Sequence, residues 1–112
     1  MKILLDHCLN WRLKRSFPLH DVLSAGEMGW ERLTNGNLLA TAAHEGFEIL
    51  LTVDRNMVHQ QNPRHLPISV MLIVVVSNEI HNVLPLVPRI EREIARMMPR
   101  TVIEIHADAT DE

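Results

Sequence analysis

The sequence predicts an α/β domain: a mostly parallel five-stranded sheet between two layers of helices, joined by right-handed crossovers. Short apolar runs alternate along the chain with segments of helical periodicity, which is the pattern of such a sheet. Two of the apolar runs end at an aspartate, Asp6 and Asp54. The most apolar run, Ile68 to Val76, is β-branched on both faces, as expected of a central strand covered on both sides.

The N-terminal half contains the first three predicted strands and two predicted helices. The strands cover residues 3–5, 20–25 and 47–53, and the helices cover residues 9–15 and 38–45. Asn35 or Asn37 is a candidate N-cap for the second helix, and Gly46 is its natural C-terminal stop. Each helix therefore links two successive strands.

The C-terminal half supplies the remaining elements. A polar stretch at 55–64 leads to the strand at 68–76. A last helix is expected to begin near Pro85 or Pro88 and to end at Met98, before a final strand at 101–106. The domain should span residues 1–107, followed by an acidic tail at 108–112.

Composition and charge limit the possible functions. The chain has 112 residues, of which 46% are hydrophobic, so one domain with a substantial core is expected. A net charge of -3 argues against non-specific coating of nucleic acid. Arg12, Lys14 and Arg15 nevertheless form a local basic segment that can accept a phosphate backbone.

Three features predict a cytoplasmic protein that does not enter a membrane. The single Cys8 cannot form an internal disulfide, which points to a reducing compartment. Asp6 interrupts the first apolar run too early for a signal peptide. The longest apolar run, Val70 to Val76, is far shorter than the roughly 20 residues that span a bilayer.

Asp6 and Asp54 are the main candidates for a functional site. Ligands of open α/β sheets bind beyond the carboxyl ends of the strands, where the strand order reverses, and the first strand usually lies there. The two carboxylates are thus expected to converge on neighbouring strands. They repel each other unless a proton or cation intervenes, and Mg²⁺ prefers such oxygen ligands. Glu27, after the second strand, can supply a third carboxylate; helix capping is the alternative role for the aspartates.

A phosphorylation receiver domain is a second class with this layout. It also carries acids after its first strand and an acceptor aspartate after its third, and Ser77 matches a hydroxyl after the fourth. That class needs a lysine after the fifth strand. The only lysines here are Lys2 and Lys14, which argues against a receiver.

Several sequence blocks resemble a compact family of PIN-like domains, and the resemblance covers most of the chain. The blocks are Ile3-Leu4-Leu5-Asp6-His7-Cys8-Leu9, Glu27-Met28-Gly29-Trp30, Leu33-Thr34-Asn35-Gly36, Leu38-Leu39-Ala40, Leu50-Leu51-Thr52-Val53-Asp54-Arg55-Asn56, Gln60-Gln61-Asn62, Ser77-Asn78 and Leu84-Pro85-Leu86-Val87-Pro88. The resemblance implies a PIN-like three-layer sandwich. It also implies kinship with VapC-type toxins, which are ribonucleases dependent on Mg²⁺ or Mn²⁺, and a small DNA-binding antitoxin as partner.

The resemblance also assigns residues by position. Asp6, Glu27 and Asp54 match the metal-binding and catalytic acids that follow the first three strands. The chain departs from the family pattern where Asn37, Asn56 and Asn78 stand in positions that often hold acids. Fewer carboxylates imply weaker metal binding.

Other polar and aromatic residues are candidates for contact with RNA. Arg12, Arg55, Gln61 and Asn78 are the predicted substrate-binding residues, with solvated helix faces and loop capping as the structural alternatives. Trp11 and Trp30 can stack on bases, but a role in the core is favoured for both. The histidines do not follow the spacing of a zinc site.

The sequence therefore supports one leading hypothesis and two others. The leading hypothesis is a toxin-type ribonuclease dependent on Mg²⁺ or Mn²⁺. The alternative is a catalytically weak or inactive module that binds protein or RNA. A third role is purely structural, as a homodimer with Leu84, Leu86 and Val87 in its apolar surface.

Overall fold

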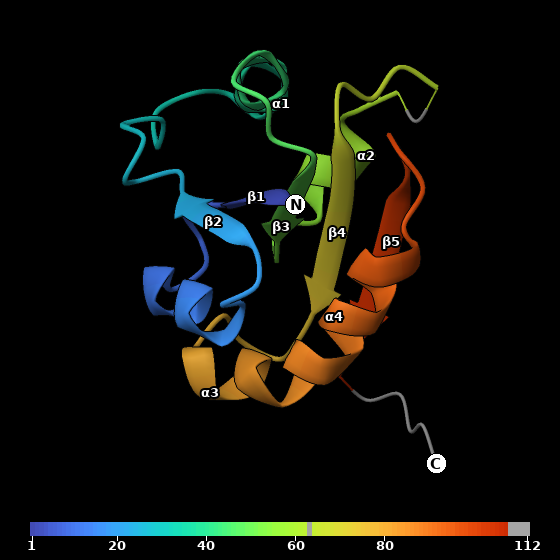
Figure 1. Ribbon diagram of the computed structural model, residues 1–112. Helices are drawn as coiled ribbons and strands as arrows, with labels where there is room; N and C mark the ends of the chain where they lie inside the picture. The colour runs from blue at the N-terminus through green and yellow to red at the C-terminus, as the bar shows by residue number, and fades with distance from the viewer. Residues whose placement is uncertain (63, 108–112) are drawn as a thin grey trace.

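A parallel sheet lies at the centre of the computed structural model, which describes residues 1–62 and 64–107 (Figure 1). Within those residues it has five strands in the order β2-β1-β3-β4-β5. The strands are β1 (Lys2–Leu5), β2 (Asp21–Ser24), β3 (Ile49–Thr52), β4 (Ser69–Val74) and β5 (Val102–His106). The α/β prediction is confirmed, and the sheet is wholly rather than mostly parallel. The acidic tail predicted at 108–112 lies outside the described residues.

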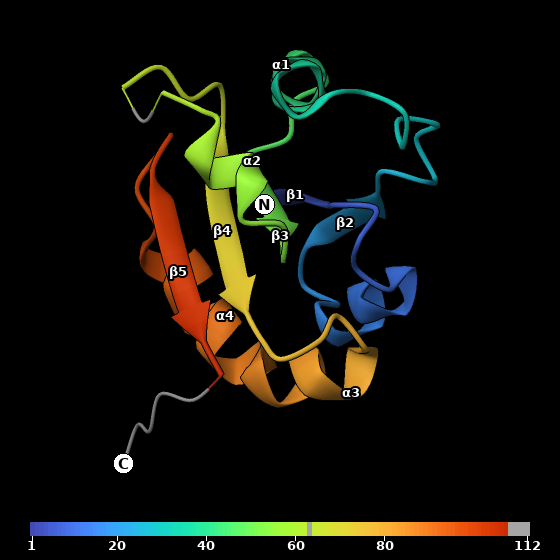
Figure 2. The ribbon, with the colours of Figure 1, turned by 180° about the vertical axis from the view of Figure 1, so that it is seen from behind.

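Helices cover both faces of the sheet and complete three layers (Figures 1 and 2). One face packs against α1 (Asn35–His44) and α2 (Asn56–His59), and the other against η1 (Trp11–Ser16), α3 (Ile80–Val83), η2 (Leu84–Leu86) and α4 (Val87–Arg96). Side chains alternate between the faces along each strand. Leu4 and Leu50 contact the first layer, whereas Leu5 and Leu51 contact the second.

Several element boundaries differ from the predictions. The segment after β1 forms a 3-10 helix, a common short connector, rather than an α-helix. Thr34, not Asn35 or Asn37, caps α1, because its extended backbone lets Oγ1 accept a hydrogen bond from Asn37 N at 3.4 Å. The polar stretch at 55–64 contains α2, and helical structure after β4 begins at Ile80, before either proline.

The connections do not all have the same hand. The β2–β3 and β4–β5 connections step in the same direction along the sheet, but α1 lies on one face and α4 on the other. Two such connections have opposite hands, so the expectation of right-handed crossovers throughout is wrong for one of them. After β4 the chain first runs back to β1, where Asn78 Nδ2 donates a hydrogen bond to Cys8 O at 2.8 Å.

This topology places a switch point between β1 and β3. The chain leaves β1 for β2 on one side and returns to β3 on the other. Leu5, the last residue of β1, pairs with Leu51 of β3, so the two carboxyl ends are adjacent. The predicted position of Asp6 and Asp54 at neighbouring strand ends is therefore confirmed.

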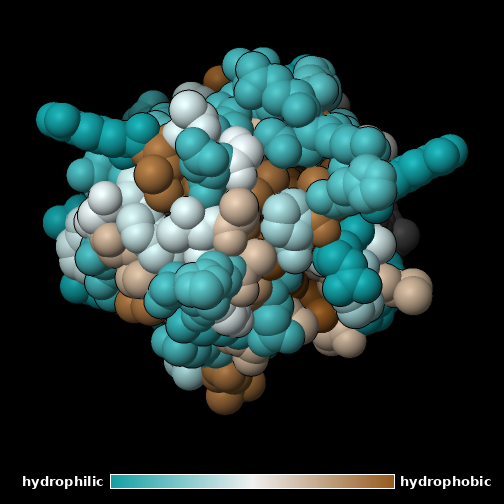
Figure 3. Space-filling view, turned by 90° about the horizontal axis from the view of Figure 1, so that it is seen from above, coloured by the Kyte–Doolittle hydropathy of each residue, from teal (hydrophilic) through white to brown (hydrophobic). Residues whose placement is uncertain are grey.

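The surface gives no support to the proposed apolar dimer face. Leu86 is 6% exposed and belongs to the core, and Val87 packs against that core, which leaves Leu84 exposed. On the opposite side of the molecule, seen from above α1, hydrophobic atoms are scattered in small areas between hydrophilic ones (Figure 3). Among the described residues, no helix has both the length and the apolar character needed to cross a bilayer.

Candidate functional site

Asp6 is a buried carboxylate held by its neighbours at the end of β1. Its residue is 1% exposed, and its backbone N extends the ladder by donating to Leu51 O at 2.9 Å. Thr52 Oγ1 donates to Asp6 Oδ2 at 2.7 Å, and His7 N donates to Oδ1 at 2.8 Å. His7 Nδ1 also lies 3.1 Å from Oδ1. A buried charge needs such partners, and hydrogen bonds to it are stronger than those between neutral groups.

Thr52 connects this carboxylate to Asp54. Because Leu5 pairs with Leu51, the next residues, Asp6 and Thr52, lie side by side on the same face. The Thr52 hydroxyl donates to Asp6 and accepts a hydrogen bond from Asp54 N at 3.0 Å. One fully buried hydroxyl thus fixes the ends of both strands.

Asp54 is more accessible than Asp6. It is half-buried, and its Oδ1 accepts a hydrogen bond from Asn56 N at 2.9 Å as α2 begins. The N-cap residue of α2 is Arg55, which has no side-chain capping bond, so the Asp54 bond closes a local turn before the helix. Within the described residues this is the only hydrogen bond to its carboxylate, so Oδ2 is left for a ligand.

Cys8 lies near both acids and close to Thr52. Burial raises the pKa of the Cys8 thiol, and the nearby Asp6 and Asp54 charges raise it further. The thiol is therefore protonated at neutral pH, which agrees with a packing role rather than a nucleophilic one. Its Sγ lies 3.6 Å from Thr52 Oγ1, and its carbonyl accepts the Asn78 amide. Asn78 is thereby brought from the end of β4 to the site.

Glu27 follows β2 as predicted, but its carboxylate is engaged elsewhere. Oε1 accepts a hydrogen bond from Ser24 N at 2.9 Å, and Ser24 Oγ accepts one from Glu27 N at 3.1 Å, a reciprocal capping arrangement. Oε2 pairs with Lys14 Nζ at 2.6 Å. The hydrogen bond from Lys14 is the main cause of the lowered pKa of Glu27, with the Ser24 backbone next.

This lowered pKa predicts a pH-dependent effect of Glu27→Gln. A carboxylate whose pKa is lower in the folded state stabilises the fold above its unfolded value, and this is lost as the pH falls through the folded value. Because the pair is well exposed, the variant should be less stable by only about 0.5 kcal/mol near neutral pH. Urea denaturation at neutral and acidic pH measures this. A difference that does not shrink in acid would contradict the prediction.

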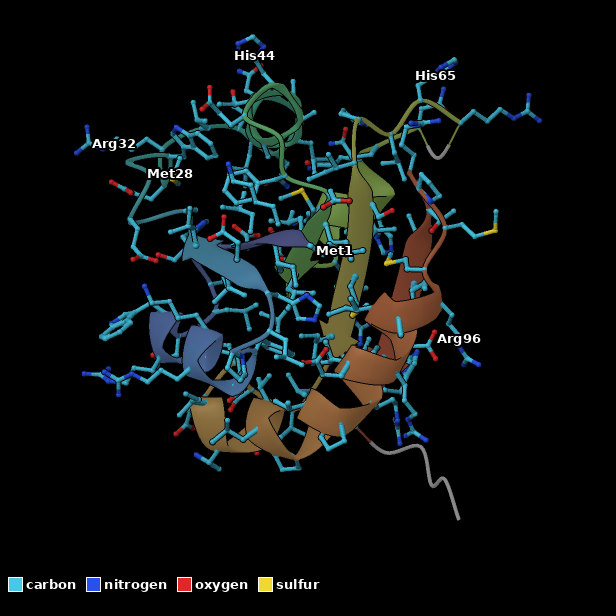
Figure 4. The ribbon with its side chains drawn as sticks, viewed as in Figure 1. Met1, Met28, Arg32, His44, His65 and Arg96 are labelled. Carbon is cyan, nitrogen blue, oxygen red and sulfur yellow. The ribbon has the colours of Figure 1, made fainter. Side chains whose placement is uncertain are left out.

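The structure does not gather the three predicted acids into one metal-binding group. Among the described residues, no three or more His, Cys, Asp or Glu side chains are placed to hold an ion together. What remains is the Asp6 and Asp54 pair. The histidines are also dispersed: His44 on α1 and His65 on the loop after α2 point outward from separate elements (Figure 4).

The two tryptophans have different environments. Trp30 packs against the core and meets Phe47 edge to face, with ring centroids 5.9 Å apart, which confirms its predicted core role. The same prediction for Trp11 is wrong, because this side chain is 41% exposed on η1. Arg12 is exposed beside it, with Cζ 4.8 Å from the indole centroid.

The other predicted contact residues are less closely gathered. Arg55 is exposed directly after Asp54, at the carboxyl end of β3. Gln61 is half-buried with its side-chain oxygen beside Gly36 in the first turn of α1, and Gln60 accepts a hydrogen bond from Asn35 there at 3.3 Å. A side-chain hydrogen bond therefore ties Gln60 to α1, and Gln61 lies against α1.

Sequence reasoning missed Thr52 and His7 as parts of the site. Each lies within two residues of a predicted acid, but their contacts depend on the register of β1 and β3 and on the turn after β1. Comparison with known proteins adds no relative: no family model matches the chain, and no curated protein or solved structure matches it.

Proposed function

We propose that the protein is a ribonuclease dependent on Mg²⁺ or Mn²⁺, with Asp6 and Asp54 as its metal-binding acids. The observation that carries this proposal is the Thr52 hydroxyl bridge, which fixes the Asp6 carboxylate beside the Asp54 backbone at the switch point. Open α/β sheets bind their ligands at such a point, beyond the carboxyl ends of the strands. The resemblance to PIN-like domains supplies the reaction class.

The donor set fits such an ion. Magnesium is commonly held by one or two carboxylates, with waters and substrate phosphate oxygens completing its shell. Asp54 has an uncommitted oxygen, and Asp6 is oriented by Thr52 and His7 N. When bound, the ion would offset the repulsion between the acids and supply an activated water for attack on phosphorus.

The chain's own residues would position the substrate. The exposed guanidinium of Arg55 lies next to Asp54 along the chain and can pair with a phosphate. The Asn78 side chain joins the loop after β4 to the loop after β1 through the Cys8 carbonyl, and so keeps these two loops together beside the acids. Glu27 has a positioning role in this scheme, since it holds Lys14 of η1 against the β2 end.

A binding module without catalysis is the second candidate. The engagement of Glu27 with Lys14 and Ser24 favours it, because only two acids are then left for a metal. In either role we place the protein in a toxin–antitoxin pair, with a small DNA-binding antitoxin as partner, on the resemblance alone. Co-purification with the product of a neighbouring gene tests that setting.

Calorimetric titration with Mn²⁺ and Mg²⁺ separates the two candidates. The ribonuclease proposal predicts binding with one ion per chain, weakened at least about tenfold by Asp54→Asn because one carboxylate ligand is lost. The matched control is Asp21→Asn, which makes the same change on an exposed residue at the opposite end of the sheet. No heat of binding up to millimolar metal would support the binding module instead.

A further inference from the structure

The most unusual surface feature is an exposed indole surrounded by cations on η1. Trp11 is 41% exposed, although a side chain of this size is normally largely buried. Arg12 Cζ lies 4.8 Å from its ring centroid, Arg15 Cζ 5.2 Å and Lys14 Nζ 5.8 Å. These are cation–π distances, so the charges and the ring form one unit.

Two of the three cations carry uncompensated charge. Lys14 is neutralised by Glu27, with Nζ and Oε2 2.6 Å apart. Arg12 and Arg15 are exposed, and neither pairs with a carboxylate among the residues that the structure describes. The unit therefore presents two positive guanidinium groups and an aromatic ring on a chain whose net charge is -3.

The surface beside Trp11 is hollowed toward the acid pair. Two shallow hollows of about 460 and 290 Å³ share Trp11, Ser24 and Gly26 in their linings. The smaller one extends to Arg12 and His7, and His7 contacts the Asp6 carboxylate. A ligand seated at Trp11 can thus continue along the surface to the strand ends.

We infer that Trp11, Arg12 and Arg15 form a binding platform for single-stranded RNA. In the complex Arg12 and Arg15, which lie over the indole in the free protein, turn to the flanking phosphates, and a base stacks on the ring plane that they leave. Stacking on an aromatic ring together with phosphate contacts is how proteins hold single strands without reading their sequence. An acidic peptide would use the cations but not the ring, and duplex bases are already stacked on one another. The choice of RNA as the ligand rests on the proposed function. The requirement that the ligand carry both an aromatic face and several negative charges rests only on the geometry around Trp11.

The test measures binding without catalysis. Fluorescence anisotropy follows a labelled oligouridylate of about 12 nucleotides titrated with the full chain in EDTA. Trp11→Ala should bind about tenfold more weakly, from the loss of one stacked base, and Trp11→Phe should restore most of the affinity. In the double variant Arg12→Gln/Arg15→Gln, the logarithm of the RNA association constant should fall less steeply with the logarithm of the salt concentration. The slope should be shallower by about 1.4, or about 0.7 for each lost phosphate contact.

Controls and competitors make the outcome decisive. Arg64→Gln removes one exposed charge from the loop between α2 and β4 and should leave binding unchanged. Absence of wild-type binding, equal affinity of wild type and Trp11→Ala, or equal weakness of the Ala and Phe variants would each overturn the platform. Polyglutamate competing as well as oligouridylate would overturn it in favour of an acidic protein partner. Because EDTA is present, a failure of metal-dependent cleavage leaves this result unaffected.

Discussion

Asp54→Asn is expected to lower Mn²⁺-dependent RNA cleavage by about 100-fold or more, because it removes half of the carboxylate pair proposed to hold the metal. A 100-fold loss corresponds to about 2.7 kcal/mol of transition-state stabilisation. The fold should be preserved, since an asparagine Oδ1 can still accept the hydrogen bond that Asn56 N donates at 2.9 Å. Cleavage of a labelled RNA, with wild type and variant purified in parallel, measures the effect.

Two controls distinguish a loss of metal-dependent activity from a contaminating nuclease and from misfolding of the variant. Asp21→Asn should cleave at the wild-type rate, because Asp21 begins β2 at the opposite end of the sheet. EDTA should abolish the wild-type activity. If Asp54→Asn and wild type cleave equally, the metal-dependent ribonuclease assignment is wrong, whatever the calorimetry shows.

The positions of the two aspartates could be predicted because they depend on local sequence. Each follows a short apolar run, and the charged residue after such a run marks the point where the buried strand ends. The parallel arrangement and the switch point then follow from the alternation of elements. The Ser24 to Glu27 capping arrangement was not predicted, although a serine and a glutamate three residues apart can satisfy each other's backbone N–H.

The remaining features depend on contacts between distant residues. The Lys14–Glu27 pair requires η1 to pack beside the end of β2, which periodicity does not reveal. The exposure of Trp11 runs against the usual burial of tryptophan and follows from a 3-10 helix that turns Leu13 inward instead. Asn78 reaches Cys8 because the chain after β4 runs back toward β1 before crossing to β5.

Thr52→Val is expected to destabilise the fold by about 2–3 kcal/mol, although valine has nearly the same shape as threonine. The hydroxyl donates to the buried Asp6 carboxylate and accepts from Asp54 N, so its loss leaves a buried charge and a backbone N–H without this partner. Hydrogen bonds to charged groups contribute about 1.5–3 kcal/mol each, and an unsatisfied buried group costs about 1–3 kcal/mol. Urea denaturation of wild type and variant measures the free energy of unfolding.

The Thr52 hydroxyl can be separated from its methyl group and from its two partners. Thr52→Ser keeps the hydroxyl and should cost only about 1 kcal/mol, for one buried methyl group. In an Asp6→Asn background the charge is gone, so Thr52→Val should cost less than in wild type, with a coupling energy of about 1 kcal/mol or more. A cost that is the same in both backgrounds would place the stabilisation in the bond with Asp54 N rather than in the bond with Asp6. The bridge would then hold the two strand ends together without orienting the carboxylate on which the proposed metal site depends.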